Sequence, residues 1–168
     1  SAPEEEGAAG SQDETVEVLT TLAQSQPVYT CVDTLAACKR LVADLKQQKR
    51  FALDTETTGL DARHADLLGI SLAYTAGEGY YIPLHNKKTS VAKALLACLK
   101  PLLQDTTIEK IGQNLKYDLH VLRRYDLEVQ GPFFDTMVAH HRVEPEGRHN
   151  LNAMAAAYLH YAPIPIEK

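Results

Sequence analysis

The chain has 168 residues, enough for one domain with a sizeable core, and its hydrophobic content of 45% and charged content of 23% are ordinary for a globular protein. No apolar run approaches the roughly 18 residues that a membrane-spanning helix needs, so we expect no membrane partner. The three cysteines lack a CxxC spacing, which argues against a disulfide framework or a zinc knuckle. We expect a cytoplasmic protein.

The net charge of −5 is unevenly distributed along the chain. Residues 1–26 contain six acidic residues and no Lys or Arg, which leaves 16 acidic and 17 basic residues in 27–168. The first segment is rich in Ser, Ala, Glu, Gln and Thr, a composition typical of a flexible linker. We therefore predict an acidic linker over 1–26 and one near-neutral domain over 27–168. This charge balance neither requires nor excludes a nucleic-acid partner.

From Pro27 onward, the sequence predicts an α/β layer fold with a mixed sheet flanked by helices, in which an initial antiparallel meander precedes parallel strands. The predicted strands cover residues 28–32, 50–55, 67–74, 80–84, 107–112 and 133–135. The predicted helices cover residues 35–45, 136–143 and 151–159 and two further segments that start at 90 and 114. The expected N-caps are Asp33, Ser90, Asn114 and Asn150.

Two carboxylates, Asp54 and Glu56, follow the apolar run 51–53. Residues two apart in a strand point to the same face of the sheet. The apolar run predicts a buried strand, and unpaired buried charge is costly, so a bound cation explains the pair better than a surface position at the strand end. Carboxylate oxygens are ligands that Mg²⁺ or Mn²⁺ prefers.

A second polar cluster contains Gln113, Asn114 and Asp118. Asn114 and Asp118 are four residues apart and would share one face of a helix. By themselves they would be read as a helix N-cap and a solvated carboxylate. Considered with Asp54 and Glu56, they give three acids that could converge on two cations.

These residues carry a specific resemblance. The segments 51–60 and 112–118 resemble the first two motifs of the 3′→5′ proofreading exonuclease domain of bacterial DNA polymerase I, and the segments 134–137 and 147–151 match further landmarks of that family. The resemblance covers roughly residues 27–168. It implies a ribonuclease H-like fold and an Asp-Glu-Asp-Asp catalytic set, in which Asp54, Glu56 and Asp118 match three acids.

The fourth acid of the family lies in a Tyr-x-x-x-Asp motif on a helix after the region that corresponds to 163–168, and this chain has no such motif there. Tyr158 and Tyr161 are followed four residues later by Ala162 and Pro165. Asp135 matches a landmark that is not catalytic. We therefore expect the chain to be a C-terminally truncated domain with weak or no nuclease activity of its own.

The resemblance also implies the mechanism and the partners. Two Mg²⁺ or Mn²⁺ ions would support hydrolysis of phosphodiesters at a single-stranded or frayed DNA 3′ end, with Asp54 bridging the ions. The polymerase domain of the same polypeptide would be the partner, in the bacterial cytoplasm at the nucleoid. Two alternatives stay open: a catalytically silent exonuclease-like module of a polymerase, and a ribonuclease D-like enzyme that trims RNA 3′ ends.

The family match places further residues at the substrate. Leu60 would wedge against the terminal base, and Ile166 falls where relatives place an apolar or aromatic residue under the bases. The remaining substrate contacts would come from Thr57, Gln113, Asn114 and Arg148.

The sequence also contains His140, His141 and His149. Adjacent histidines of a helix do not face each other, so we do not expect a histidine metal site.

Overall fold

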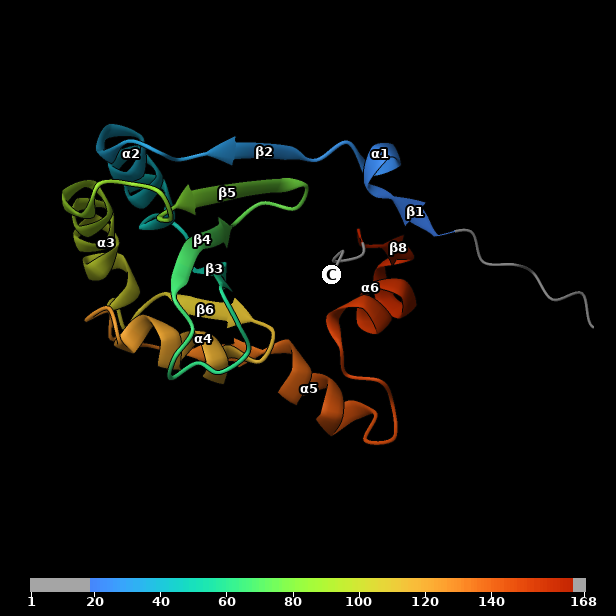
Figure 1. The fold of residues 1–168 in the computed structure, drawn as a ribbon. Coiled ribbons are helices and arrows are strands. Elements are labelled where there is room, and N and C mark those ends of the chain that lie inside the picture. The colour runs from blue at the N-terminus through green and yellow to red at the C-terminus, as the bar shows by residue number, and fades with distance from the viewer. Residues whose placement is uncertain (1–18, 165–168) are drawn as a thin grey trace, which may run out of the picture.

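The computed structural model describes residues 19–164, in which six strands form one mixed sheet in the order β2-β5-β4-β3-β6-β7 (Figure 1). The strands of this sheet are β2 (Val28–Cys31), β3 (Arg50–Thr57), β4 (Leu67–Ala73), β5 (Glu78–Pro83), β6 (Glu109–Gly112) and β7 (Phe133–Asp135). The helices are α1 (Leu22–Ser25), α2 (Leu35–Leu45), α3 (Thr89–Leu103), α4 (Leu115–Arg123), α5 (Thr136–Val143) and α6 (Leu151–Leu159). No described helix is long and apolar enough to cross a membrane.

The strand pairing confirms the predicted fold class. β3, β4 and β5 form the antiparallel meander, and β6 and β7 extend the sheet in parallel beyond β3. A second, very short parallel pair joins β1 (Thr20–Thr21) to β8 (Tyr161–Ala162). The predicted linker thus has regular structure over residues 20–25, and its residues 1–18 lie outside the described part of the chain.

Two helix starts differ from the prediction. Thr34, rather than Asp33, caps α2, because its hydroxyl accepts a hydrogen bond from the Ala37 amide at 3.2 Å. Helix α3 starts at Thr89, with Lys88 at the N-cap position, so Ser90 lies inside the helix. The predicted cap of α6 is confirmed, since the Asn150 side chain accepts from the Ala153 amide at 2.8 Å.

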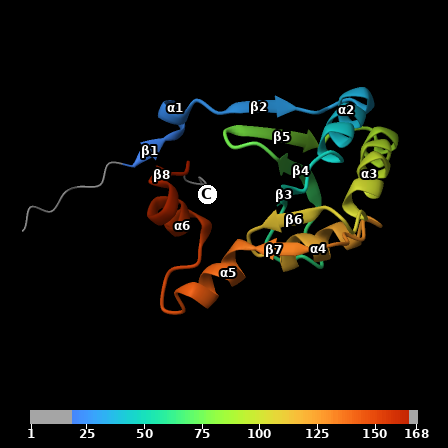
Figure 2. The same cartoon turned by 180° about the vertical axis from the view of Figure 1, so that it is seen from behind.

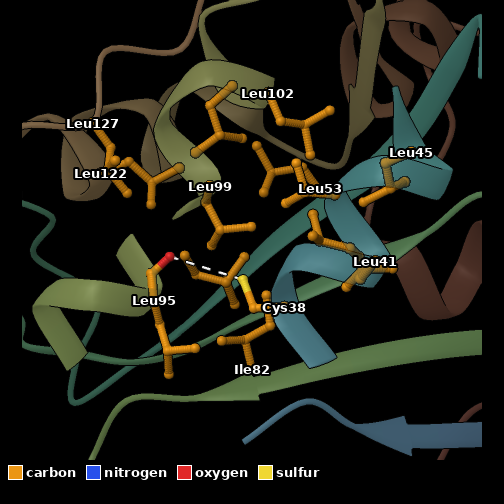
Figure 3. Close-up of a cluster of buried hydrophobic side chains, with 14 of the residues drawn as sticks. Cys38, Leu41, Leu45, Leu53, Ile82, Leu95, Leu99, Leu102, Leu122 and Leu127 are labelled. Carbon is orange, nitrogen blue, oxygen red and sulfur yellow. Dashed lines mark hydrogen bonds between the residues drawn. The ribbon is translucent and has the colours of Figure 1, made fainter. Parts of the chain in front are cut away.

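One face of the sheet carries the hydrophobic core. Figure 3 shows leucines of α2 and α3 in one cluster with Leu53 of β3 and Ile82 of β5. Helix α4 adds Leu122 to the same cluster. The apolar spacing of these helices therefore puts all three on one face.

The other face of β3 is open. Phe51, Leu53 and Thr55 are buried, whereas Ala52, Asp54 and Glu56 are exposed. Figures 1 and 2 show α6 and β8 on the side of the sheet opposite α2 and α3. The prediction of a fully buried strand is therefore wrong: β3 alternates between a core face and an open face.

A buried lysine connects the loops that precede β6 and β7. Lys110 of β6 is 0% exposed, and its ammonium donates to the backbone carbonyls of Ile108 at 2.9 Å, Gln130 at 2.7 Å and Asp105. Burial lowers the pKa of Lys110. The three carbonyls lie before β6 and before β7, so the lysine joins the two loops that set the position of these strands.

We expect Lys110→Met to lower the free energy of unfolding by about 2–4 kcal/mol, because it leaves three carbonyls without their donor. Urea unfolding followed by circular dichroism measures this change. Lys39→Met, at an exposed position of α2, is the matched control and should change stability by less than about 0.5 kcal/mol. Equal stability of the two variants would contradict the structural role of Lys110.

Candidate active site

The C-terminal end of β3 carries two of the predicted acids. Asp54 and Glu56 lie on the same, open face of the strand, and the pairing with β4 shifts register between Glu56 and Thr57. The prediction that the two carboxylates share a face is confirmed. The buried acid is instead Asp118 of α4, which is only 3% exposed.

Asp118 is held by the residue between the two strand carboxylates. Its Oδ1 accepts from the backbone amide of Thr55 at 2.9 Å and from the Thr55 hydroxyl at 2.5 Å. This amide is available because β6 pairs only with residues 50–52 of β3. The helix carboxylate thus replaces a missing strand partner of Thr55, the residue between Asp54 and Glu56.

Burial and the neighbouring carboxylates disfavour the ionised form of Asp54, and burial disfavours that of Asp118. Desolvation by the cleft wall, followed by repulsion from Asp118 and Glu56, raises the pKa of Asp54 to about 6. Burial also raises the pKa of Asp118, although the hydrogen bonds from Thr55 oppose this effect. A cation between these groups would relieve both costs.

The start of α4 differs from the prediction. Asn114 precedes the helix in the left-handed conformation, with φ of 59°, and its side chain makes no capping hydrogen bond. It therefore does not share a helix face with Asp118. Asp135 acts as the cap instead, because its two oxygens accept from the amides of Asn114 at 3.1 Å and Leu115 at 2.8 Å.

Asp135 also caps its own helix. Its Oδ1 accepts from the amides of Met137 at 2.9 Å and Val138 at 3.2 Å. One carboxylate therefore joins the starts of α4 and α5. The sequence signal for this role is an Asp directly before a helix, the preferred residue type of an N-cap.

A cleft of about 470 Å³ opens beside Asp54. Its lining includes Asp54, Gln113 at the end of β6, and Leu151 at the start of α6. Most of the wall is apolar and comes from Tyr29, Ala52, Ala73 and Tyr80 on the open face of the sheet. Leu60 and Arg148 are not among the lining residues.

The other predicted substrate residues occupy distinct places. Leu60 is 97% exposed on the loop after β3. The hydroxyl of Tyr117, which the sequence did not single out, holds this loop by donating to the Gly59 carbonyl at 2.5 Å. Thr57 is 2.5 Å from the same hydroxyl. Arg148 is exposed before α6, and Ile166 lies outside the described residues.

The donor chemistry of the three acids fits a hard divalent cation, since all ligands offered are carboxylate oxygens. Asp118 uses only Oδ1 for Thr55, so its second oxygen is not needed for that contact. Within residues 19–164, no group of three or more His, Cys, Asp or Glu side chains forms a ready-made metal site. The carboxylates of β3 and α4 therefore do not form a closed cage in the described part of the chain.

The fold of this chain is similar to those of solved proteins. *Brucella melitensis* NrnC with bound Mg²⁺ aligns with a TM-score of 0.61 and 24% identity, covering 85% of this chain and 65% of that chain. *Escherichia coli* RNase D aligns with a TM-score of 0.62 and 23% identity, covering 77% of this chain and 33% of that one. The fold is that of the ribonuclease H-like exonucleases.

The model of a family described as 3′-5′ exonuclease matches residues 29–168, and the chain belongs to this family. DNA polymerase I of *Pseudomonas aeruginosa* is 33% identical over 152 residues, which are 86% of this chain and 17% of that protein. The chain thus spans about a sixth of the length of this relative.

The raised pKa of Asp54 makes stability depend on pH. Between about pH 4 and pH 6 the folded state keeps a proton that the unfolded state has lost, so stability falls as the pH rises; below this range both states are protonated and the penalty disappears. Because the side chain is exposed, solvent screens the charge, and we expect ionised Asp54 to lower the free energy of unfolding by about 1 kcal/mol. Asp54→Asn should therefore be about 1 kcal/mol more stable than the parent chain at pH 7 and equally stable at pH 3.5.

Urea unfolding at the two pH values measures this difference. Asp44→Asn, which removes an exposed carboxylate of α2, serves as the control and should show no such gain. A stability difference for Asp54→Asn that is the same at both pH values would contradict the electrostatic description of the site.

Proposed function

We propose that this chain is the 3′→5′ exonuclease domain of a DNA polymerase and that it hydrolyses the terminal phosphodiester of a single-stranded or frayed DNA 3′ end. The observation that carries this proposal is the pair of hydrogen bonds by which Thr55, the residue between Asp54 and Glu56 of β3, holds the Asp118 carboxylate. The family of the chain and the DNA polymerase I relative support the reaction class and the attached polymerase domain. Because its proposed substrate is DNA, we place the protein at the bacterial nucleoid.

Asp54, Glu56 and Asp118 are the residues that would hold Mg²⁺ or Mn²⁺ in a two-ion site. When bound, such ions stabilise the attacking and leaving oxygens of a phosphodiester displacement. The Mg²⁺ of the structural neighbour NrnC is consistent with this choice of ion. Ionisation of Asp54 would follow cation binding, because the bound charge reverses the effect that raises its pKa.

The remaining residues would position the DNA end. Leu60 is almost fully exposed on a loop that Tyr117 anchors, so it can insert against the terminal base without losing core contacts. Thr57 lies beside it and would contact the terminal nucleotide. Gln113, Asn114 and Arg148 would approach the sugar and phosphates, and Ile166 would lie under the bases. Single strands are commonly held by such stacking and backbone contacts without sequence preference.

Two other functions make different predictions. A ribonuclease D-like enzyme would degrade an RNA 3′ end faster than the matched DNA. The structural likeness to RNase D is the reason to test RNA beside DNA. A silent structural module would bind neither cation nor DNA at the acids. The retained set of Asp54, Glu56 and Asp118, with a hydrogen-bonded support for Asp118, favours the catalytic function.

The test uses 5′-labelled DNA and RNA oligonucleotides of one sequence, with the chain and either Mg²⁺ or Mn²⁺. We expect cation-dependent binding of the DNA 3′ end and slow shortening from that end, with both lost in Asp54→Ala. In the polymerase that carries the domain, the same substitution should lower exonuclease activity at least about 100-fold while circular dichroism shows an intact fold. Asp44→Ala is the control.

Unchanged 3′→5′ degradation by the Asp54→Ala polymerase would contradict the assignment of the site. Faster trimming of RNA than of DNA would favour the ribonuclease D-like function. Absence of any cation-dependent DNA binding that needs Asp54 would favour the silent module.

A further inference from the structure

Three histidines meet between α5 and α6, although no local pattern of residues predicts that they lie together. His149 lies at the centre, with its Nδ1 2.6 Å from Nδ1 of His140 and its Nε2 3.1 Å from Nδ1 of His141. The ring of His149 meets both partner rings edge to face, at interplanar angles of 69° and 82°. We call these three residues the histidine clasp. The two neighbours on α5 do not face each other, but both reach the loop residue between them.

The clasp connects three parts of the chain. The His149 carbonyl accepts from Nε2 of Gln113 at 2.6 Å, and Oε1 of Gln113 accepts from the Thr136 hydroxyl at 2.5 Å. On the other side, Tyr158 of α6 packs edge to face on His140, with ring centroids 5.4 Å apart. The clasp therefore ties the end of β6 and helix α6 to α5. Gln113 and Leu151, at the start of α6, both line the cleft beside Asp54.

One carboxylate and one phenol also lie beside the clasp. Glu144 lies 3.4 Å from Nε2 of His140, and the Tyr158 hydroxyl donates to the same carboxylate at 3.4 Å. The Pro145 carbonyl is 3.3 Å from Nε2 of His149. These are acceptors or neutral groups, so they tolerate added positive charge at His140 and His149. They do not change the number of protons that the two nitrogen-to-nitrogen contacts can hold.

The number of protons that the three imidazoles can carry without breaking their contacts is limited. Each of the two nitrogen-to-nitrogen contacts needs one proton between its atoms, and the outer Nε2 atoms of His140 and His141 can hold one each, which gives room for four protons. Three neutral imidazoles carry three. One additional proton therefore fits the clasp, and a second forces two N–H groups to face each other across a hydrogen-bonding distance.

We infer that His140, His141 and His149 are positioning residues that hold Gln113 and α6 at the cleft, and that binding of a second proton to the clasp releases them. Imidazoles take up protons mainly between pH 5 and 8, so the release falls on the acidic side of neutrality. The conformational part of this inference needs no substrate. Its effect on DNA binding rests on the proposed exonuclease function.

Hydrogen exchange of the α6 amides, corrected for the intrinsic effect of pH, tests the conformational part. We expect protection of α6 to fall about tenfold or more between pH 7.5 and pH 5. His149→Gln should show low protection at both pH values, whereas His120→Gln, at an exposed position of α4, should retain the wild-type response. Unchanged α6 protection between the two pH values, or wild-type behaviour of His149→Gln, would overturn the inference.

Histidine titration by NMR in the unaltered chain keeps the inference testable if His149→Gln fails to fold. We expect one proton to bind while α6 stays protected and the second to bind together with the loss of protection. Three independent titrations with α6 unchanged would overturn the clasp. In the enzyme assay, His149→Gln should raise KM for DNA about tenfold with little change in kcat. Loss of the exchange effect refutes the clasp, whereas unchanged 3′→5′ degradation by the Asp54→Ala polymerase refutes the proposed function instead.

Discussion

The two hydrogen bonds from Thr55 to Asp118 are the constraint on which the site depends. They connect residues that are 63 positions apart in the sequence, and they place a helix carboxylate beside two strand carboxylates. They form because β3 continues past the end of its pairing with β6. The helix that carries Asp118 is in turn fixed at its start by Asp135, which also starts α5. The position of Asp118 relative to β3 therefore depends on the point at which the pairing of β3 with β6 stops.

This arrangement has an electrostatic cost. Asp54 is exposed to solvent, yet the cleft wall and its two acidic neighbours raise its pKa to about 6. A protein that used these residues only for stability would gain by separating or replacing them. Groups with perturbed pKa values concentrate at functional sites, where a ligand offsets the cost. A divalent cation is the ligand whose charge and oxygen preference match this set.

Much of the fold was predictable because it rests on local patterns. Alternation and apolar spacing gave the strands and the core faces of α2 and α3, and the two-residue spacing of Asp54 and Glu56 gave their common face. The apolar run 51–53 misled because Ala52 is small enough to face the open side, so the strand is only half buried. The N-cap of α2 differed by one residue and that of α3 by two, the cap of α6 was as predicted, and Asp135 replaces Asn114 as the cap of α4. The burial of Asp118 and the meeting of His149 with α5 depend on contacts between distant segments, which no local pattern encodes.

The central claim is that these three carboxylates converge on a cation, and anomalous diffraction from crystals of the chain grown with Mn²⁺ tests it most directly. We expect a manganese peak within about 2.5 Å of an Asp54 oxygen, with Glu56 or Asp118 as a further ligand. Crystals of Asp54→Asn grown in the same way should lack this peak. Manganese bound elsewhere, with none at Asp54 in the unaltered chain, would contradict the account.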